Sequence, residues 1–329
     1  MSRSKVRLKR NDLQFRGFGR YKAEITMLIV FVLFCLLMSL ASPFFMTRQN
    51  LLNVLTQISV NAVLAIGMTF VILTAGIDLS VGGSLGLSAM VSGIVMKDAH
   101  SVGLGILCAL LVGLFIGVVN GFLIGYMKMP AFIVTLGVMQ ICKSLTYVIS
   151  DGHSQSGFPE GFAFIGQMKI GGLLPFYAIL TLLMYIIFIF VLNRAKFGRF
   201  LYAVGSNAEA ARLSGIRIGW VIMRAYLLSG LLGAVAGIIM VSRMMAVDPT
   251  YGKDAEMDAI AAVVIGGTSM MGGKGTLVGT MIGVCLVGFL RNALNLLGIN
   301  PFWQGSAVGL VIIAAVLTEK LSSKRGRSV

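Results

Sequence analysis

Long apolar runs, each close to the length of a membrane span, recur along the whole chain. The first of them, residues 25–45, is too long for the apolar core of a signal peptide and lacks a small-residue cleavage site, so we expect it to be retained as a span. Only 12% of the residues are charged and 57% are hydrophobic, whereas soluble domains carry about 25% charged residues. The sequence therefore predicts an all-α polytopic membrane protein.

The apolar runs and the polar segments between them predict about ten membrane-spanning helices. The first seven cover residues 25–45, 50–74, 80–96, 102–127, 130–150, 173–192 and 219–241. The segment 258–318 must cross an odd number of times and is long enough for three short spans, with breaks near 268–275 and 298–301. Five spans precede the loop 151–172 and five follow it. This division allows an inverted 5+5 repeat, although the two halves show little similarity in sequence.

The placement of charge predicts the topology. Basic residues exceed acidic ones by six in residues 1–24, by four in 194–219 and by three in 319–329. By the positive-inside rule these three segments face the cytoplasm, and the more acidic segment 242–258 faces outside. The sequence favours this interpretation over nucleic-acid or anionic-lipid binding, because no aromatic interleaving or nucleic-acid module accompanies the charge. We therefore expect a cytoplasmic tail at 1–24, a membrane domain at 25–318 with a cytoplasmic insert, and a cytoplasmic tail at 319–329.

A short polar break separates the second and third apolar runs. It reads GIDLSVGG from Gly76 to Gly83, with the carboxylate of Asp78 between two apolar segments. Glycines at both ends predict a broken helix that is buried in protein or lines water. An ionisable residue at this depth is a candidate for a pathway or gate, and capping of a helix that begins near Ser80 is an equally good interpretation. Lys143, toward the outer end of its span, is expected only to snorkel.

The remaining glycine and cysteine patterns indicate architecture and not chemistry. Gly113, Gly117, Gly121 and Gly125 recur every four residues and predict a smooth helix face for close packing. The segment 266–276 does not fit a phosphate-binding loop, because Thr268 stands at its first glycine position and Gly275 replaces the magnesium-binding hydroxyl. A re-entrant break is the better interpretation. Without a catalytic triad, a paired carboxylate or a metal-ligand cluster, the sequence predicts neither an enzyme nor a resident cofactor or metal.

The polar insert at 194–219 has the pattern of a capped cytoplasmic helix. Ser206 and Glu209 fit a capping box, Arg212 complements the C-terminal dipole, and Gly215 can take the left-handed cap. A helix of about 12 Å is expected over 206–214. A helix of that size suits a groove in another protein, although the same pattern also occurs in ordinary loop helices.

Three segments together resemble the ribose-type sugar permeases of bacterial ABC importers. They are GMTFVILTAGIDLSVGGSLGL (67–87), FGRFLYAVGSNAEAARLSGIRI (197–218) and DAIAAVVIGGTSMMGGKGTLVGT (258–280). The resemblance implies that the insert is a coupling segment seated in a groove of the ATPase, through Gly205, Asn207, Glu209, Ala210, Arg212 and Gly215. It also places the break near the translocation path, through Asp78, Ser80, Gly76 and Gly82. Gln57, Asn61 and Asn120 are further candidates there, each equally able to satisfy a neighbouring helix backbone.

The resemblance further implies a set of partners in the bacterial inner membrane. They are a cytoplasmic ATPase that holds ATP and magnesium, a periplasmic or lipid-anchored sugar-binding protein, and a second permease, either a copy or a related chain. No cofactor on this chain and no nucleic acid is expected. Two alternatives stay open. One is an ABC permease for nucleosides or branched-chain amino acids, and the other is an ion-coupled carrier in which Asp78 is the working carboxylate.

Overall fold

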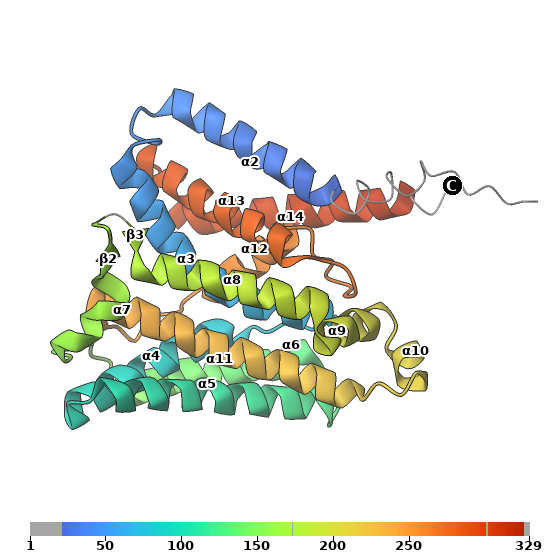
Figure 1. Ribbon diagram of the computed structural model, residues 1–329, viewed down its shortest axis with the longest axis horizontal. Coiled ribbons are helices and arrows are strands. Elements are labelled where there is room, and N and C mark those ends of the chain that lie inside the picture. Colours follow the sequence, from blue (N-terminus) through green and yellow to red (C-terminus); the bar gives the residue numbers. More distant parts are fainter. Residues whose placement is uncertain (1–21, 173, 301, 326–329) are drawn as a thin grey trace, which may run out of the picture.

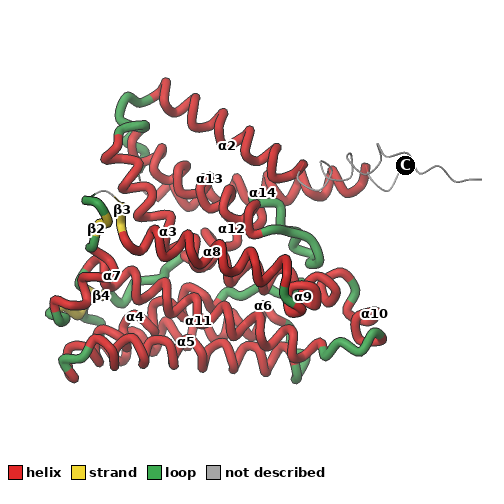
Figure 2. The backbone as a smooth tube through the Cα atoms, viewed as in Figure 1, coloured by secondary structure: helices red, strands yellow, loops and turns green. Residues whose placement is uncertain are grey.

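The protein is a bundle of long helices with a few two-residue strands at one end (Figures 1 and 2). The computed structural model describes residues 22–172, 174–300 and 302–325, so most of the predicted tail at 1–24 and residues 326–329 lie outside the described residues. The elements are α2 (Lys22–Ala41), α3 (Arg48–Leu73), α4 (Ser80–Ala99), α5 (Val102–Gly125), α6 (Ala131–Ser150), β1 (Gln155–Ser156), η1 (Glu160–Phe162), α7 (Ala163–Gln167), β2 (Lys169–Ile170), β3 (Leu174–Pro175), α8 (Phe176–Arg194), α9 (Lys196–Ser206), α10 (Ala208–Leu213), α11 (Ile218–Met244), β4 (Ala246–Val247), α12 (Ala255–Ile265), α13 (Leu277–Leu296) and α14 (Phe302–Arg325).

Within the described residues, eight helices are long and apolar enough to cross a membrane: α2, α3, α4, α5, α6, α8, α11 and α13. The first seven match the seven runs predicted before residue 242. After the seventh run the described residues form α12, α13 and α14, separated close to the two predicted breaks, but α12 has only 11 residues. At 1.5 Å per residue that is about 16 Å, roughly half of a bilayer core. The total of ten spans and the inverted repeat stay predictions.

Helices α3, α4 and α11 form the buried centre, and α2, α5, α6 and α8 surround them. The apolar windows of α3, α4 and α11 are 72–78% buried, against 17–28% for the four outer helices. The outer helices instead expose large apolar side chains such as Leu40 (88%), Phe115 (69%) and Phe190 (66%). Such faces are stable against lipid, so the protein is an integral membrane protein with its polar groups turned inward.

The predicted glycine face of α5 packs against α11. A Cβ added to Gly113 would collide with the backbone of Gly230, and one added to Gly121 would lie 2.8 Å from the Cα of Met223. Small residues allow this approach, which supplies van der Waals contact where apolar burial alone gives no preference for protein over lipid. The prediction of a packing role for this face is confirmed.

The two ends of the bundle differ in the segments they gather. At one end the Thr276 hydroxyl donates to Glu24 at 2.9 Å, the Gly273 amide donates to the Leu73 carbonyl at 3.0 Å, and α10 projects outward (Figure 1). At the other end β1 pairs with β4 and β2 with β3, both antiparallel. The predicted basic insert and the predicted acidic loop therefore lie at opposite ends.

Candidate functional site

The break between α3 and α4 folds back into the bundle around Asp78, which is 1% exposed. Its Oδ1 accepts from the Ser80 amide at 2.9 Å and the Ser80 hydroxyl at 2.6 Å, and its Oδ2 accepts from Ser229 Oγ on α11 at 2.7 Å. The amide of Asn120 on α5 donates to Ser80 Oγ at 2.7 Å. Asp78 thus satisfies the first amide of α4 and joins the break to α11 and, through Ser80, to α5, which supports the capping interpretation, whereas its role in a pathway or gate stays a prediction.

The first turn of α4 meets the start of α12 inside the bundle. A Cβ on Gly82 would collide with the Glu256 carboxylate and with the carbonyl oxygen of Gly252. Gly76, the other flanking glycine, would place a Cβ 2.6 Å from the hydroxyl of Tyr226. Both glycines therefore permit close packing around the break. The space that a Cβ would occupy at each of them is filled by neighbouring atoms.

Two ion pairs hold the start of α12. Lys143 Nζ of α6 lies 3.2 Å from Glu256 Oε1, and Arg291 Nη2 of α13 lies 2.6 Å from Asp258 Oδ1. The amide of Asn61 on α3 also donates to Asp258 Oδ2 at 3.3 Å. Burying a carboxylate is costly unless it is paired, and these partners offset that cost.

The ion pairs correct two expectations. Lys143 does not simply snorkel to the outer surface, because it pairs with a carboxylate whose side chain is 4% exposed. Glu256 and Asp258 were counted in an acidic outer segment, but they are 3% and 7% exposed and belong to the interior. Arg291, a lone cation within an apolar run, was the signal that sequence analysis missed, since a cation inside a span requires a partner.

A cavity of about 210 Å³ opens beside these ion pairs. Its lining carries amides, a carboxylate and two cations among apolar residues: Gln57, Val60, Asn61, Leu85, Met240, Arg243, Gly252, Lys253, Ala255 and Asp258. Such a mixture of donors and acceptors suits a small polar solute that bonds through several hydroxyl groups.

The structure therefore separates the predicted pathway residues into two groups. Gln57 and Asn61 line the cavity, together with Asp258, Arg243 and Lys253, which sequence analysis did not select. Asp78, Ser80 and Asn120 form the buried hydrogen-bond network instead. Gly252 lines the cavity and packs on Gly82, so the first turn of α4 connects the two groups.

The insert consists of two helices, α9 and α10, with Asn207 between them. Asn207 Oδ1 accepts from the Ala210 amide at 2.9 Å and caps α10, so the predicted capping box at Ser206 is wrong. Ser206 is instead the last residue of α9. The exposed carboxylate of Glu209 pairs with Arg212, whose Nε lies 3.0 Å from Glu209 Oε2. This contact holds the pKa of the Glu209 carboxyl below its usual range. Gly215 has the expected left-handed backbone, with φ at 81°.

Within the insert, helix α9 contacts the residues next to the break. A Cβ on Gly205 would collide with the carbonyl oxygen of Leu73, the residue that ends α3 just before the break. The same carbonyl accepts from the Gly273 amide, and the Tyr202 hydroxyl donates to the Gly275 carbonyl at 2.7 Å. The glycine-rich segment 266–276 is thus the connector between α12 and α13, packed on α9.

Comparisons with known proteins identify the family of the chain. The family described as "Branched-chain amino acid transport system / permease component" matches residues 50–316. The chain is 41% identical to the ribose import permease protein of Bacillus subtilis over 98% of this chain and 100% of that one. It is 41% identical to the Escherichia coli K12 ribose import permease (89% and 92% covered) and 36% identical to the D-allose transport system permease of the same strain (91% and 92%).

No solved structure matches the chain. The family match covers most of the sequence, and it includes both the break and the insert. The chain therefore belongs to the branched-chain amino acid transport system permease family, and within it to the group that contains the ribose import permeases.

Proposed function

We propose that this chain is the membrane-spanning permease subunit of an ABC importer that moves a ribose-like monosaccharide into a bacterial cell. The relatives named as ribose import permeases cover nearly the whole chain, which supports the substrate class. The cavity beside Asn61 and Asp258 supports it independently, because its two neutral amides and its charged side chains offer donors and acceptors for several hydroxyl groups.

The observation that carries the proposal is the contact of α9 with the end of α3. Helix α10 projects from the bundle (Figure 1), and Gly205 of α9 rests on the Leu73 carbonyl, next to the break. A displacement of α10 is therefore transmitted through α9 to the end of α3, next to the break that contains Asp78. Uphill transport needs an energy source, and we assign it to ATP and magnesium on a cytoplasmic ATPase that receives Asn207, Glu209, Ala210 and Arg212.

The rest of the assembly follows from the two ends of the bundle. We assign the end that carries α10 to the cytoplasm, because the segment 194–219 is basic, and the positive-inside rule assigns the basic terminal segments 1–24 and 319–329 to the same side. The opposite end, with β1 and β4, receives the sugar-binding protein. A second permease, identical or related, completes the path, and the inner membrane is the location.

The experiment that tests this function uses proteoliposomes. The full chain is reconstituted either alone or with its ATPase, with loaded ribose-binding protein outside and ATP inside. Ribose uptake is expected only with the ATPase and only with ATP. If the chain alone accumulated ribose along an imposed proton or sodium gradient, an ion-coupled carrier would replace the proposal. Competition by unlabelled allose, ribonucleosides or leucine separates a sugar permease from a nucleoside or amino acid permease.

A pull-down tests the coupling segment. Ala210→Glu places a charge on α10, and we expect the ATPase to be lost from the purified complex. Lys169→Glu, on β2 at the opposite end, is the matched control and should retain it. Loss of the ATPase from both variants, or from neither, would remove α10 from the interface.

A further inference from the structure

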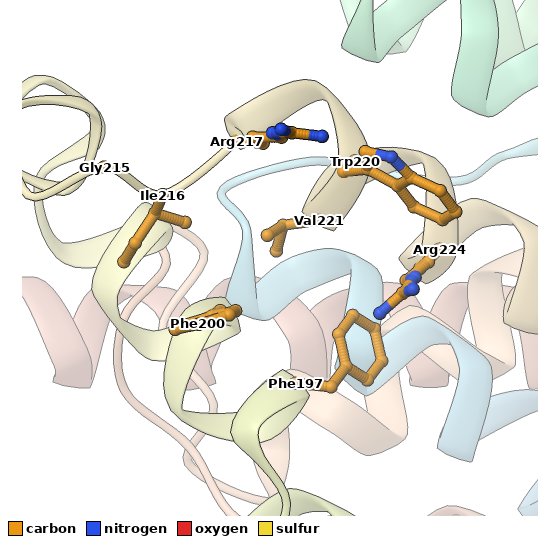
Figure 3. A pocket seen from close by; sticks show the side chains of 8 residues that line it. All are labelled: Phe197, Phe200, Gly215, Ile216, Arg217, Trp220, Val221 and Arg224. Carbon is orange, nitrogen blue, oxygen red and sulfur yellow. The ribbon is translucent and has the colours of Figure 1, made fainter.

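A second cavity, of about 400 Å³, lies where α9 meets the start of α11. Figure 3 shows its lining: Phe197, Phe200, Gly215, Ile216, Arg217, Trp220, Val221 and Arg224. It is larger than the cavity at Asn61 and lies at the insert end of the bundle. Of its lining residues only Gly215 is one of the predicted coupling residues, and the proposed transport mechanism uses none of the others.

The cavity carries two cations that have no acidic partner among the described residues. None of the ion pairs found in those residues includes Arg217 or Arg224, whose guanidinium instead lies 4.2 Å from the centre of the Trp220 ring. Residues 194–224 hold six basic side chains and one acidic side chain, Glu209, which pairs with Arg212. The charge of this cavity is therefore uncompensated within the described chain, and an anion would be attracted to it.

The cavity also adjoins the end of a helix that is long and apolar enough to cross a membrane. The neighbouring helix α8 exposes the large apolar side chains of Leu183, Ile187 and Phe190 and ends at Arg194, the pattern expected where a span leaves the hydrocarbon. Trp220 and Phe200, on the rim of the cavity, are 44% and 39% exposed. Aromatic residues are enriched at the level of lipid headgroups, where one side of the ring meets acyl chains and the other meets polar groups.

We propose that this cavity binds the phosphate headgroup of an anionic phospholipid of the adjacent leaflet. The guanidinium groups of Arg217 and Arg224 bond the phosphate oxygens, and the rings of Phe197, Phe200 and Trp220 cover the glycerol and the first methylenes of the acyl chains. Guanidinium groups match phosphate geometry through paired hydrogen bonds, and basic pockets beside membrane helices are suited to anionic headgroups.

Such a lipid connects the two elements that flank the coupling segment. Phe197 and Phe200 come from α9, whereas Trp220 and Arg224 come from α11, and α10 lies between these helices in the chain. A bound headgroup holds the bases of both helices together. The proposal therefore assigns a lipid dependence to the position of α10.

Native mass spectrometry of the purified full chain tests the site with dioleoyl phosphatidylglycerol and dioleoyl phosphatidylcholine as probes. Arg217→Gln/Arg224→Gln should retain phosphatidylglycerol at least tenfold more weakly than the unaltered chain. Arg194→Gln/Arg199→Gln removes the same charge from the same end, outside the cavity lining, and should bind as the unaltered chain does. Phosphatidylcholine should be retained weakly by all three.

A fluorescence measurement keeps the test independent of the arginine variants. In Trp303→Phe the remaining tryptophan is Trp220, and brominated phosphatidylglycerol should quench it more than brominated phosphatidylcholine at equal density. Equal quenching by the two lipids, or equal retention by both arginine variants, would overturn the proposal. So would displacement of the lipid by millimolar inorganic phosphate, which would make free phosphate the ligand. If the cavity variant kept its lipid and lost only the ATPase, the cavity would be part of the ATPase interface instead.

Discussion

Ser229 Oγ donates a 2.7 Å hydrogen bond to Asp78 Oδ2 across 151 positions of the chain. Ser229 lies near the middle of α11, so this bond fixes the break between α3 and α4 deep in the bundle. Gly67 of α3 approaches the same serine so closely that a Cβ there would lie 2.9 Å from its Cα. One position on α11 thus sets the depth at which α4 begins.

Removing this bond should destabilise the folded protein. Ser229→Ala leaves one carboxylate oxygen of Asp78 without its donor, and we expect a loss of about 1–2 kcal/mol, since bonds between membrane helices contribute less than buried bonds to charge in soluble proteins. Unfolding by SDS titration in mixed micelles measures it. Ser88→Ala is the control, because the Ser88 hydroxyl is buried and accepts or donates no hydrogen bond among the described residues. An equal loss in both variants would show that the bond to Asp78 contributes nothing specific.

The Lys143–Glu256 pair should behave as a unit. Lys143→Met leaves the Glu256 carboxylate, 4% exposed, without a counter-charge, and stability should fall by about 1–3 kcal/mol, less than for a fully buried pair because Lys143 is 32% exposed. Adding Glu256→Gln should recover part of the loss. Lys97→Met, which removes a lysine that bonds the amide of Gln155, is the control. A double variant no better than Lys143→Met alone would contradict this account.

The cavity residues should govern uptake. Asn61→Ala removes a donor to Asp258 and a lining amide, and ribose uptake should fall about five- to tenfold, as expected for one or two lost hydrogen bonds. Uptake is measured in cells that lack their own ribose permease, with ATPase recovery checked in the same extracts. Asn53→Ala changes an exposed asparagine of the same helix and should transport normally. Normal uptake by Asn61→Ala would move the path elsewhere.

Gly205 should not tolerate a methyl group. In Gly205→Ala the new Cβ would collide with the Leu73 carbonyl and would lie 2.5 Å from the Gly273 amide nitrogen. The collision should separate α9 from the break. We expect lower expression and, in the protein that folds, ATP hydrolysis without uptake. Gly137→Ala is matched to it, because nothing lies within 4 Å of a Cβ there and alanine favours a helix. Tight coupling in Gly205→Ala would contradict the proposed connection.

The end of the bundle opposite α10 should loosen in acid. Ser154, and both the hydroxyl and the amide of Thr250, donate to the Asp248 carboxylate and hold its pKa below its ordinary value. A lowered folded-state pKa means that this stabilisation is complete above the unfolded pKa and is lost as pH falls through the folded value. Hydrogen exchange of segments 151–172 and 246–254 should therefore accelerate at pH 3 relative to pH 7, after correction for intrinsic rates. Asp248→Asn should remove that difference, and persistence of the difference in this variant would assign it to another group.

Much of the architecture was predictable because its causes are local. Membrane-length apolar runs located the first seven long helices, and glycines beside Asp78 located the break before α4. The insert was also located correctly, but its cap was assigned to Ser206, since a serine three residues before a glutamate fits the pattern as well as Asn207 does. Which of these two adjacent residues caps α10 depends on where α9 ends. That end lies beside the close contact of Gly205 with Leu73, which is a tertiary contact and not a local one.

The candidate site was predictable only in part. Gln57 and Asn61 could be selected because polar residues in an apolar helix need a partner, but Glu256 and Asp258 looked like surface acids on local composition. The partners of these two acids, Lys143, Arg291 and Asn61, lie 113, 33 and 197 positions away.

The sequence by itself determined that the chain enters a membrane as helices and that the second and third of them are separated by a break, because hydropathy and backbone preference act over a few residues. The tertiary structure alone decided which charges neutralise one another and where a polar cavity remains. Those outcomes depend on close approach between distant helices, and no local pattern encodes which helix faces will meet.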